Sequence, residues 1–457
     1  MKKSISGFSK LSKRRKLRWI VENFFKDPEN VMRELMSYWH RNEDQQKILD
    51  GFSENTISNY FLPYGVAPNF LINGKTYCVP MVTEESSVVA AASSAAKYWS
   101  TRGGFTAEVL STKKVGQVHF TWAGNFQRLQ SVLEELKKQL LQDVATITHN
   151  MRNRGGGVLR IELLDMRHLD DDYYQLKVNF ETCDSMGANF INSVLENFGQ
   201  SLKRFVATNP VFPDEEREVD IIMAILSNYT PECIIRCSVS CPIKELGAFS
   251  NEIDAEAFAE KFYKAIKIAR VDTYRAATHN KGIFNGVDAV VMATANDFRA
   301  VEACGHTYAA RDGQYRSLSY CTIDNGVFKF WLDLPLALGT VGGLTKLHPM
   351  ARRSLELLGS PSAKELMKIV CATGLAQNFA AIKSLVTTGI QQGHMKMHLL
   401  NILNHLGATD QEKTIASTYF EDKVVSFTAV QHFLDGLRTK KKALKFIKKP
   451  PTINEEI

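Results

Sequence analysis

The sequence predicts an α+β protein in which a large domain of mixed helices and strands is interrupted by a smaller domain and followed by a helical segment. Two observations support this prediction. The chain has 457 residues, 44% of them hydrophobic and 23% charged, a composition typical of globular proteins with several domains and not of disordered or fibrous ones. Helical and strand-like hydrophobic patterns also follow one another along the chain without an internal repeat, as in mixed folds.

The first part of the large domain combines helices with a hairpin. Apolar residues such as Leu17 and Val21 recur at helical spacing within residues 8–50, which predicts helices there. The segment INGKTYCVPMV then predicts strand structure with a hairpin turn at Asn73-Gly74. SSVVAAASSAAKYW predicts a helix whose small side chains allow close packing against another backbone.

Residues 112–228 have the pattern of a compact insertion. FQRLQSVLEELKKQLLQDVATIT predicts one long amphipathic helix, and a turn of three glycines follows it. VLRIELLDM and YYQLKVNFET predict strands, and ANFINSVLENFGQSLKRFV predicts a second helix.

The remainder returns to strands, Gly-rich turns and helices before a helical end. Ser362 and Glu365 have the spacing of a capping box. Gly389 and Gly393 precede HMKMHLLNILNHL, and such glycines suit either a hinged lid or an ordinary helix break. The expected organisation is a large domain over residues 1–111 and 229–387, a small domain over 112–228, and a C-terminal helical flap with a basic tail over 388–457.

The net charge of +7 is concentrated at the two ends. Residues 1–20 hold eight Lys and Arg and no acid, and residues 437–457 hold seven with two acids. These ends are either solvated helix ends or contacts for nucleic acid or acidic lipid. No stretch of about 18 apolar residues is apparent, so no membrane span is expected.

The eight cysteines include no CxxC pair, which argues against a zinc ribbon or a thioredoxin-like site. Free thiols in a chain of this size predict a reducing, cytoplasmic environment. In ECIIRCSVSC, the residues Cys233, Cys237 and Cys241 alternate at strand period, which predicts a buried strand face.

Two segments place carboxylates at the start of a helix. In TEESSVVAAAS, the adjacent side chains of Glu84 and Glu85 point to opposite sides, so one of them can face inward and deliver a proton. Capping of the helix is the alternative. Asp297 follows an apolar strand pattern in VVMATANDFRA, which suits a functional carboxylate or an N-cap.

Two further segments carry cations and imidazoles. DTYRAATHNKGIFNG gathers Arg275, Lys281 and Asn285 before Gly turns; Arg can clamp a carboxylate and Lys can stabilise an oxyanion, although a polar surface loop is equally compatible. QQGHMKMH has Met395 where the H-E-x-x-H motif has its Glu, so His394 and His398 do not predict a zinc site. A His at a helix start can instead act as a general acid.

Two Gly-containing segments suggest nucleotide binding. DSMGANFIN places a glycine at a helix start, and GTVGG is a Gly turn. Neither segment is a G-x-G-x-x-G fingerprint, but a helix N-terminus binds phosphate without one.

Taken in order, ENTISNYFLPYGVAPNF, TEESSVVAAAS, DSMGANFIN, DTYRAATHNKGI, NDFRAVEA, GTVGGLTKLHP, GLAQN and GHMKMH resemble the class II, bacterial-type 3-hydroxy-3-methylglutaryl-CoA reductases. The resemblance implies a soluble oxidoreductase that converts (S)-3-hydroxy-3-methylglutaryl-CoA to (R)-mevalonate and CoA with two NAD(P)H in the mevalonate pathway to isoprenoids. It also implies a large domain interrupted by a small NAD(P)-binding domain of ferredoxin-like topology, a closing C-terminal flap, and a homodimer or higher oligomer with the active site at the subunit interface.

The resemblance also implies residue roles. Lys281 would stabilise the oxyanion, Glu85 would supply protons to that oxygen, Asp297 would sit between these two, and His394 would protonate the departing CoA thiolate. The paired-Glu segment would reach the site from the neighbouring subunit. The residues expected to hold the substrate's carboxylate and hydroxyl end are Arg275, Ser87 and Asn285. Those expected to bind the cofactor are Asp184, Met186, Gly187, Asn189, Asn192 and Arg152.

The segment TITHNMRNRGGG bears on the choice of cofactor. NADH-specific relatives have an Asp before the three glycines, whereas this chain has Arg152 and Arg154 and no carboxylate. Arginine favours a 2′-phosphate, so NADPH is expected, with NADH as the alternative and no metal.

Three positions depart from the usual family pattern. Ser58 and Ala295 stand where the family usually has Gly, and Ser185 where it has Ala. A methyl group at Ala295 would shift Asp297 if that position needs a positive φ.

Two other functions are compatible with the sequence. The same fold could oxidise mevalonate with NAD in the catabolic direction. A non-catalytic protein could bind RNA or membrane through its basic ends, although the presence of Glu85, Lys281, Asp297 and His394 argues against this.

Overall fold

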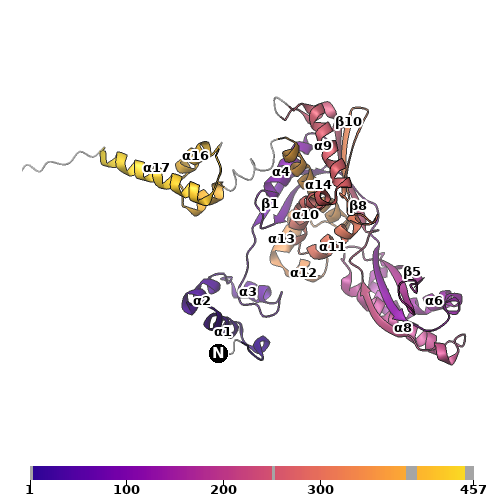
Figure 1. Ribbon diagram of the computed structural model, residues 1–457. Coiled ribbons are helices and arrows are strands. Elements are labelled where there is room, and N and C mark those ends of the chain that lie inside the picture. The colour runs from indigo at the N-terminus through magenta and orange to yellow at the C-terminus, as the bar shows by residue number, and fades with distance from the viewer. Residues whose placement is uncertain (1–3, 250–252, 388–398, 422, 448–457) are drawn as a thin grey trace, which may run out of the picture.

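The computed structural model describes residues 4–249, 253–387, 399–421 and 423–447 (Figure 1). It contains many helices and several small antiparallel sheets, which confirms the predicted α+β class. Three separate hydrophobic clusters form the core of its main parts.

The N-terminal helices form as the apolar spacing predicts. Leu17 and Val21 are the buried residues of the first α-helix, and Lys13 of that helix pairs with Asp50 at 2.5 Å. Ser58 donates a hydrogen bond of 2.6 Å to the Leu35 carbonyl, so the hydroxyl at this position ties the following loop to a helix. The elements are η1 (Phe8–Lys10), α1 (Lys13–Phe24), α2 (Pro28–Ser37) and α3 (Glu43–Asp50).

The first strands of the large core form the predicted hairpin. Asn73 and Gly74 have φ of 48° and 80°, the left-handed values that a tight two-residue turn requires. The small residues of the next helix face this hairpin and a later core helix, so their close packing is also confirmed. The elements are β1 (Tyr64–Ile72), β2 (Lys75–Val82), α4 (Val88–Ser100) and β3 (Thr106–Val109).

The segment after β3 has its own sheet and its own core. Its strands follow the order β5-β6-β4-β7, and every neighbouring pair is antiparallel. The single long helix predicted here is wrong: three helices form, because the backbone departs from helical geometry at Val132 and Val144, whose φ and ψ are near −100° and 10°. The elements are β4 (Lys114–Thr121), α5 (Phe126–Ser131), α6 (Leu133–Asp143), α7 (Ala145–Arg152), β5 (Gly157–Asp165), β6 (Tyr173–Glu181), α8 (Ala188–Thr208), η2 (Asp214–Glu216) and β7 (Asp220–Leu226).

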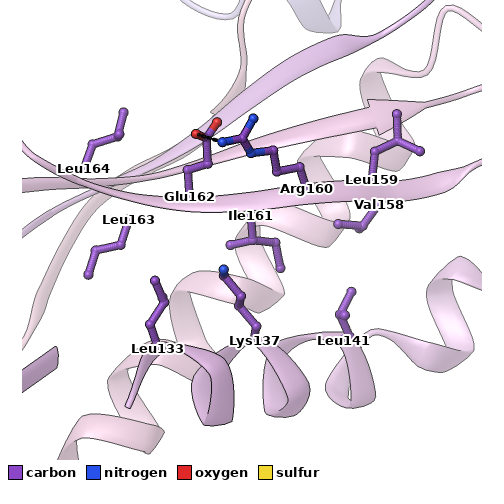
Figure 2. A pocket seen from close by; sticks show the side chains of 10 residues that line it. All are labelled: Leu133, Lys137, Leu141, Val158, Leu159, Arg160, Ile161, Glu162, Leu163 and Leu164. Carbon is purple, nitrogen blue, oxygen red and sulfur yellow. Dashed lines mark ion pairs between the residues drawn. The ribbon is translucent and has the colours of Figure 1, made fainter. Parts of the chain in front are cut away.

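A groove lined by both apolar and charged side chains lies between α6 and the edge strand β5 (Figure 2). The pairing of β5 with β6 shifts between Val158 and Arg160, so a bulge places Ile161 and Leu163 on the helix side together with Val158. Arg160 and Glu162 pair at 2.7 Å on the side away from the helix. None of the predicted site residues lines this groove.

The second part of the large core is built on the sheet β3-β8-β10-β9. Cys233, Cys237 and Cys241 are buried together with the apolar residues between them, as the alternation predicts. The elements are β8 (Ile234–Pro242), η3 (Ile243–Leu246), α9 (Ala255–Val271), α10 (Thr273–Ala293), α11 (Phe298–Ala309), β9 (Ser319–Asp324), β10 (Val327–Pro335), α12 (Gly343–Leu347), α13 (Pro349–Leu357) and α14 (Ala363–Val386).

Helix α14 runs through the large core. Its capping box of Ser362 and Glu365 forms as predicted. An 18-residue window of this helix has a mean hydropathy of 1.4, so the helix is long and apolar enough to cross a membrane by length and composition alone. Two-thirds of that window is buried inside the protein, which accounts for the apolar composition.

The described C-terminal part is helical. Residues 399–405, α16 (Asp410–Tyr419) and α17 (Phe427–Ile447) share a small apolar cluster. The Arg438 guanidinium beside Glu412 lowers the pKa of that carboxyl to about 2. Gly389 and Gly393, proposed as a hinge, lie outside the described residues.

Helices α10 and α14 approach closely at Gly286. A Cβ there would lie 2.7 Å from the Thr373 carbonyl oxygen and 2.9 Å from Gln377 Cβ. We expect Gly286→Ala to lower the free energy of unfolding by about 1–3 kcal/mol, the usual cost of overpacking a core. Gly282→Ala is the matched control, because a Cβ at Gly282 has no neighbour within 4 Å. Urea denaturation measures both, and equal effects would show that the helix contact does not require glycine.

Candidate active site

Lys281 and Glu85 form an ion pair in a cleft of about 450 Å³ in the large core. Lys281 Nζ lies 2.6 Å from Glu85 Oε2, and the two side chains are 61% and 38% exposed. Asn285 Nδ2 lies 3.4 Å from the same carboxylate oxygen. An exposed pair at a cleft leaves both charges within reach of a bound ligand.

Helix α10 positions Lys281 and Asn285. The expected Gly turns are wrong: in DTYRAATHNKGIFNG, Asp272 is the N-cap and the rest of the segment lies within this helix. Gly286 allows close packing there and does not end the helix. Lys281 and Asn285 are four residues apart and therefore share one helix face. The opposite face carries buried residues such as Ile283 and Val287.

Glu85 lies just before α4. Its backbone N–H donates to Thr83 Oγ1 at 3.2 Å, and the helix begins after Ser87, whose φ is 75°. Ser87 makes no side-chain cap to α4, so its hydroxyl is not used by the helix. A non-Gly residue with this φ is strained, and this strained residue lies two positions after Glu85, which pairs with Lys281.

The adjacent Glu84 points elsewhere, as the sequence predicts for two neighbouring carboxylates. It is exposed, and its charge acts on Asp288 of α10. Burial, with the nearby Glu302 and Glu84 carboxyls, raises the pKa of Asp288 well above its usual range. Glu85 is therefore the member of the pair that meets Lys281.

Arg275 lines the same cleft, six residues before Lys281 on α10. Burial lowers the pKa of this guanidinium, but the group stays charged at any working pH. Ser87 and Asn285 also line the cleft. The structure thus brings the predicted substrate residues together with Lys281 and Glu85.

Asp297 lies outside this cleft. Its carboxylate accepts hydrogen bonds from the Arg299 and Ala300 backbone N–H groups at 3.1 and 3.2 Å, so it caps α11 as the alternative reading predicted. Lys281 and the end of α10 at Ala293 are separated by twelve residues, which is about 18 Å of helix. Within one chain, Asp297 therefore does not sit between Lys281 and Glu85.

A second cleft of about 810 Å³ lies between the small and large cores and contains Asp297. Met186, Gly187 and Asn189 at the start of α8 line it, and so do residues of the segment Gly339–Thr345. Gly187 has φ of 92°, and a Cβ there would lie 2.5 Å from Thr182 Cγ2. The N-cap of α8 therefore needs glycine, both for its positive φ and for the space that Thr182 occupies.

Three of the predicted cofactor residues do not line the second cleft. Asp184 Oδ1 accepts from the Ala363 N–H at 2.7 Å and holds the start of α14. Asn192 Oδ1 accepts from the Leu226 N–H at 2.8 Å and ties α8 to β7. Arg152 donates to the Ala145 carbonyl within its own helix.

Several residues outside the predicted cofactor set line the second cleft or bond residues that line it. Arg154 lines it in place of Arg152, together with Asn150. Asn296 accepts from the Gly339 N–H at 2.8 Å and fixes the Gly turn. Buried Lys114 donates to the Thr182 hydroxyl and, at 2.8 Å, to the Ser185 carbonyl. Lys114 opens an ordinary strand pattern, so nothing in the sequence signals its role.

His394 lies outside the described residues. Within the residues that the structure describes, no group of three or more His, Cys, Asp or Glu side chains has an arrangement that could hold a metal ion.

Comparison with known proteins agrees with this arrangement. The family model for hydroxymethylglutaryl-coenzyme A reductase matches residues 14–399. The chain belongs to this family. It is 33% identical to the 3-hydroxy-3-methylglutaryl-coenzyme A reductase of Archaeoglobus fulgidus over 96% of both chains. It is 31% identical to a protein of the same family in Borreliella burgdorferi, over 93% of this chain and 91% of that one.

A solved structure gives the same family. The class II 3-hydroxy-3-methylglutaryl-CoA reductase from Streptococcus pneumoniae, bound to NADPH in open conformations, has a TM-score of 0.68 and 35% identity. The match covers 84% of this chain and 100% of that one. The resemblance to class II reductases seen in the sequence is thereby confirmed.

Proposed function

We propose that this chain reduces the thioester of (S)-3-hydroxy-3-methylglutaryl-CoA to the primary alcohol of (R)-mevalonate, with release of CoA and use of two NAD(P)H. The observation that carries the proposal is the Lys281–Glu85 pair at 2.6 Å in a cleft that also holds Arg275 and Asn285. Membership of the reductase family supports the same reaction.

Lys281 and Glu85 are suited to the carbonyl chemistry. Reduction of a thioester carbonyl develops negative charge on its oxygen, which the Lys281 ammonium group would stabilise. A protonated Glu85 would then donate a proton to this oxygen.

The other cleft residues suit the acyl group. The Arg275 guanidinium can hold the terminal carboxylate with two parallel hydrogen bonds. The free Ser87 hydroxyl and the Asn285 amide add donors beside Glu85. His394 is proposed to protonate the departing CoA thiolate.

The second cleft suits a nicotinamide dinucleotide. Met186, Gly187 and Asn189 present the N-terminus of α8, which favours a pyrophosphate. Arg154 adds a cation for a 2′-phosphate, and the Streptococcus pneumoniae enzyme is described with NADPH bound. When bound, NAD(P)H supplies the hydride. Asp184 and Asn192 would support the site by holding α14 and β7 in place.

We propose a homodimer in which Asp297 crosses to the partner's Lys281. In one chain the two residues lie at opposite ends of α10 and in different clefts. Glu85 already meets Lys281 within the chain, so the expectation that the Glu segment crosses the interface is replaced. Tyr60 and Tyr274, each 90% exposed, offer large apolar surface for a second copy.

The domain organisation fits this function. The strand order β5-β6-β4-β7, with one helical segment before β5 and α8 before β7, supports a ferredoxin-like NAD(P)-binding domain over residues 112–228. Residues 1–111 and 229–387 would form the large domain, and 388–457 the flap. A cytoplasmic location is proposed from the bacterial-type relatives. Neither mevalonate oxidation nor a non-catalytic role of the basic ends is favoured by these observations.

Purified protein should oxidise NADPH only when 3-hydroxy-3-methylglutaryl-CoA is present. Lys281→Ala should lower kcat by about a thousandfold or more, because it removes the group that stabilises the oxyanion. Absorbance at the nicotinamide band measures the rate, and gel filtration with circular dichroism checks folding. No oxidation of NADPH or NADH by folded wild-type protein would overturn the proposed function.

A heterodimer of Lys281→Ala and Asp297→Ala chains tests the crossing of Asp297. It should recover about half of the wild-type activity, because one of its two sites then contains an intact Lys281 and an intact Asp297. The subunits carry different affinity tags, so the heterodimer is purified by two columns.

The matched control pairs Lys281→Ala with Glu85→Gln. These residues meet within one chain, so neither site of that heterodimer is intact and no activity should return. Recovery in the control, or none in the Asp297 heterodimer, would contradict the proposed sharing.

Arg154→Asp should raise KM for NADPH by about tenfold or more and change KM for NADH little, because a carboxylate repels the 2′-phosphate. Arg152→Asp is the neighbouring control and should change neither, since Arg152 does not line the cleft. Steady-state kinetics with both cofactors measures the difference. A larger effect at Arg152 would reverse the assignment.

A further inference from the structure

Lys114 is a buried cation behind the second cleft, and the reaction described above gives it no role. It is the first residue of β4 and is 4% exposed. Its Nζ atom donates a hydrogen bond of 2.8 Å to the carbonyl of Ser185, which lines that cleft. Burial of a charged group is costly unless an opposite charge and hydrogen bonds offset it, so this ammonium group calls for a physical explanation.

Lys114 orders the turn that precedes α8. Thr182 Oγ1 donates its only proton to the Ser185 carbonyl at 2.6 Å, so it accepts from Lys114. The Ser185 N–H donates in turn to the Thr182 carbonyl at 3.0 Å. The Thr182 side chain also fills the space that a Cβ at Gly187 would need. Lys114 and Thr182 thus fix the path of residues 182–187 into the N-terminus of α8.

The opposite wall of the second cleft rests on the same turn. The Asp184 carbonyl accepts from the Thr340 N–H at 2.9 Å. A Cβ at Gly339 would lie 2.5 Å from the Met186 nitrogen, so the two segments approach closely. Both walls of the cleft therefore depend on the turn that Lys114 holds.

The charge of Lys114 has no ion-pair partner among the described residues. Both of its hydrogen-bond acceptors are neutral. The Glu181 and Asp184 carboxyls favour the charged form from nearby. Glu181, however, accepts from the Cys183 N–H, and Asp184 is bonded at the start of α14. Burial outweighs both carboxyls and lowers the pKa of Lys114, so a further negative charge nearby would stabilise the ammonium form.

The N-terminus of α8 adds positive charge at the same place. A helix N-terminus carries about half a positive charge. Lys114 is bonded to Ser185, only three residues before Ala188, the first residue of α8. Two positive features this close together disfavour each other, and an anion at the helix N-terminus would offset both.

We propose that Lys114 is a positioning residue for the dinucleotide, whose ammonium group holds the turn 182–187 and favours the pyrophosphate at the N-terminus of α8. This inference rests on the proposed function, which places the cofactor in the second cleft. Because the bound anion prefers the protonated lysine, cofactor binding should take up a proton wherever Lys114 is partly deprotonated in the free protein. The affinity should therefore fall as pH rises.

Other titratable groups also surround Lys114. The carboxyls are those of Glu181 and Asp184, and the thiols are those of Cys183, Cys233 and Cys304. Burial raises the pKa of all three thiols. Cys183 contacts a residue of the second cleft, because its Sγ donates to the Arg154 carbonyl at 3.2 Å. A thiolate there would also weaken anion binding at alkaline pH, so Cys183→Ser is a necessary control.

Lys114→Met removes the charge and both donated hydrogen bonds but keeps an unbranched side chain. Lys113→Met is the matched control, because the adjacent Lys113 forms a half-exposed ion pair with Glu232. Calorimetry in two buffers of different ionisation enthalpy measures the Kd of NADPH and NADH and the protons taken up between about pH 6.5 and pH 10. The 2′-phosphate of NADPH titrates near pH 6, so its proton count is read above about pH 8.

Wild type should take up a proton on binding either dinucleotide, and the Kd should rise with pH. Lys114→Met should raise the Kd of both by about tenfold or more, abolish the uptake, and leave kcat at saturating cofactor within about twofold. Lys113→Met and Cys183→Ser should keep the uptake. No uptake by the wild type, or its loss in Cys183→Ser, would overturn the proposal.

Thr182→Val decides the matter if Lys114→Met does not fold. It removes the hydroxyl that accepts from Lys114 and leaves the charge in place. Loss of this acceptor disfavours the ammonium form, so the rise of Kd with pH should begin at a lower pH than in the wild type. An unchanged pH dependence would show that another group takes up the proton.

The outcome is distinct from that of the proposed function. If folded wild-type protein binds NADPH with this uptake but does not oxidise it with 3-hydroxy-3-methylglutaryl-CoA, the reductase reaction fails and the role of Lys114 stands. If it oxidises NADPH while Lys114→Met binds both dinucleotides as the wild type does, the reductase reaction stands and the role of Lys114 fails. If it binds neither dinucleotide, both fail.

Discussion

The contact between α10 and α14 is the constraint on which the rest of the site depends. α10 carries Lys281 on its solvent-exposed face, and its opposite face is buried against the large core. Gly286 lets the helix backbones approach, with the Thr373 carbonyl only 2.7 Å from the position of a Cβ. Because protein interiors resist small changes in shape, a fixed distance between these helices fixes the width of the substrate cleft, which residues of both helices line.

Glu85 reaches Lys281 next to a strained backbone conformation at Ser87. Ser87 adopts a φ of 75° without a capping hydrogen bond, a conformation that costs about 1 kcal/mol for a residue with a Cβ. The cost is met by the buried helix that follows, in which Val88, Ala92 and Trp99 join the large core. Burial of α4 in the large core thus holds the Glu85 carboxylate beside the Lys281 ammonium group at the cleft.

The sequence predicted the elements whose causes are local. The Asn73-Gly74 turn, the Ser362 capping box and the alternating cysteines of β8 follow from backbone preference and burial period. Predictions failed where tertiary packing decides. Gly282 and Gly286 resemble turn residues in a sequence but lie within α10, and one helix became three at Val132 and Val144. Arg152 and Arg154 are two residues apart in the same polar segment, and only the path of the chain places Arg154 at the second cleft.

The position of Asp297 is the reason for proposing that two chains share one site. Ala295, two residues before it, has a φ of 51°, so the position does need the left-handed conformation that the family usually meets with Gly. The turn nevertheless forms, and Asp297 caps α11 at the edge of the cofactor cleft. A carboxylate held there by two backbone N–H groups cannot travel about 18 Å along α10 to Lys281. In the homodimer proposed above, Asp297 would meet Lys281 only across the interface between two copies, and assembly would then be a condition of catalysis and not only of stability.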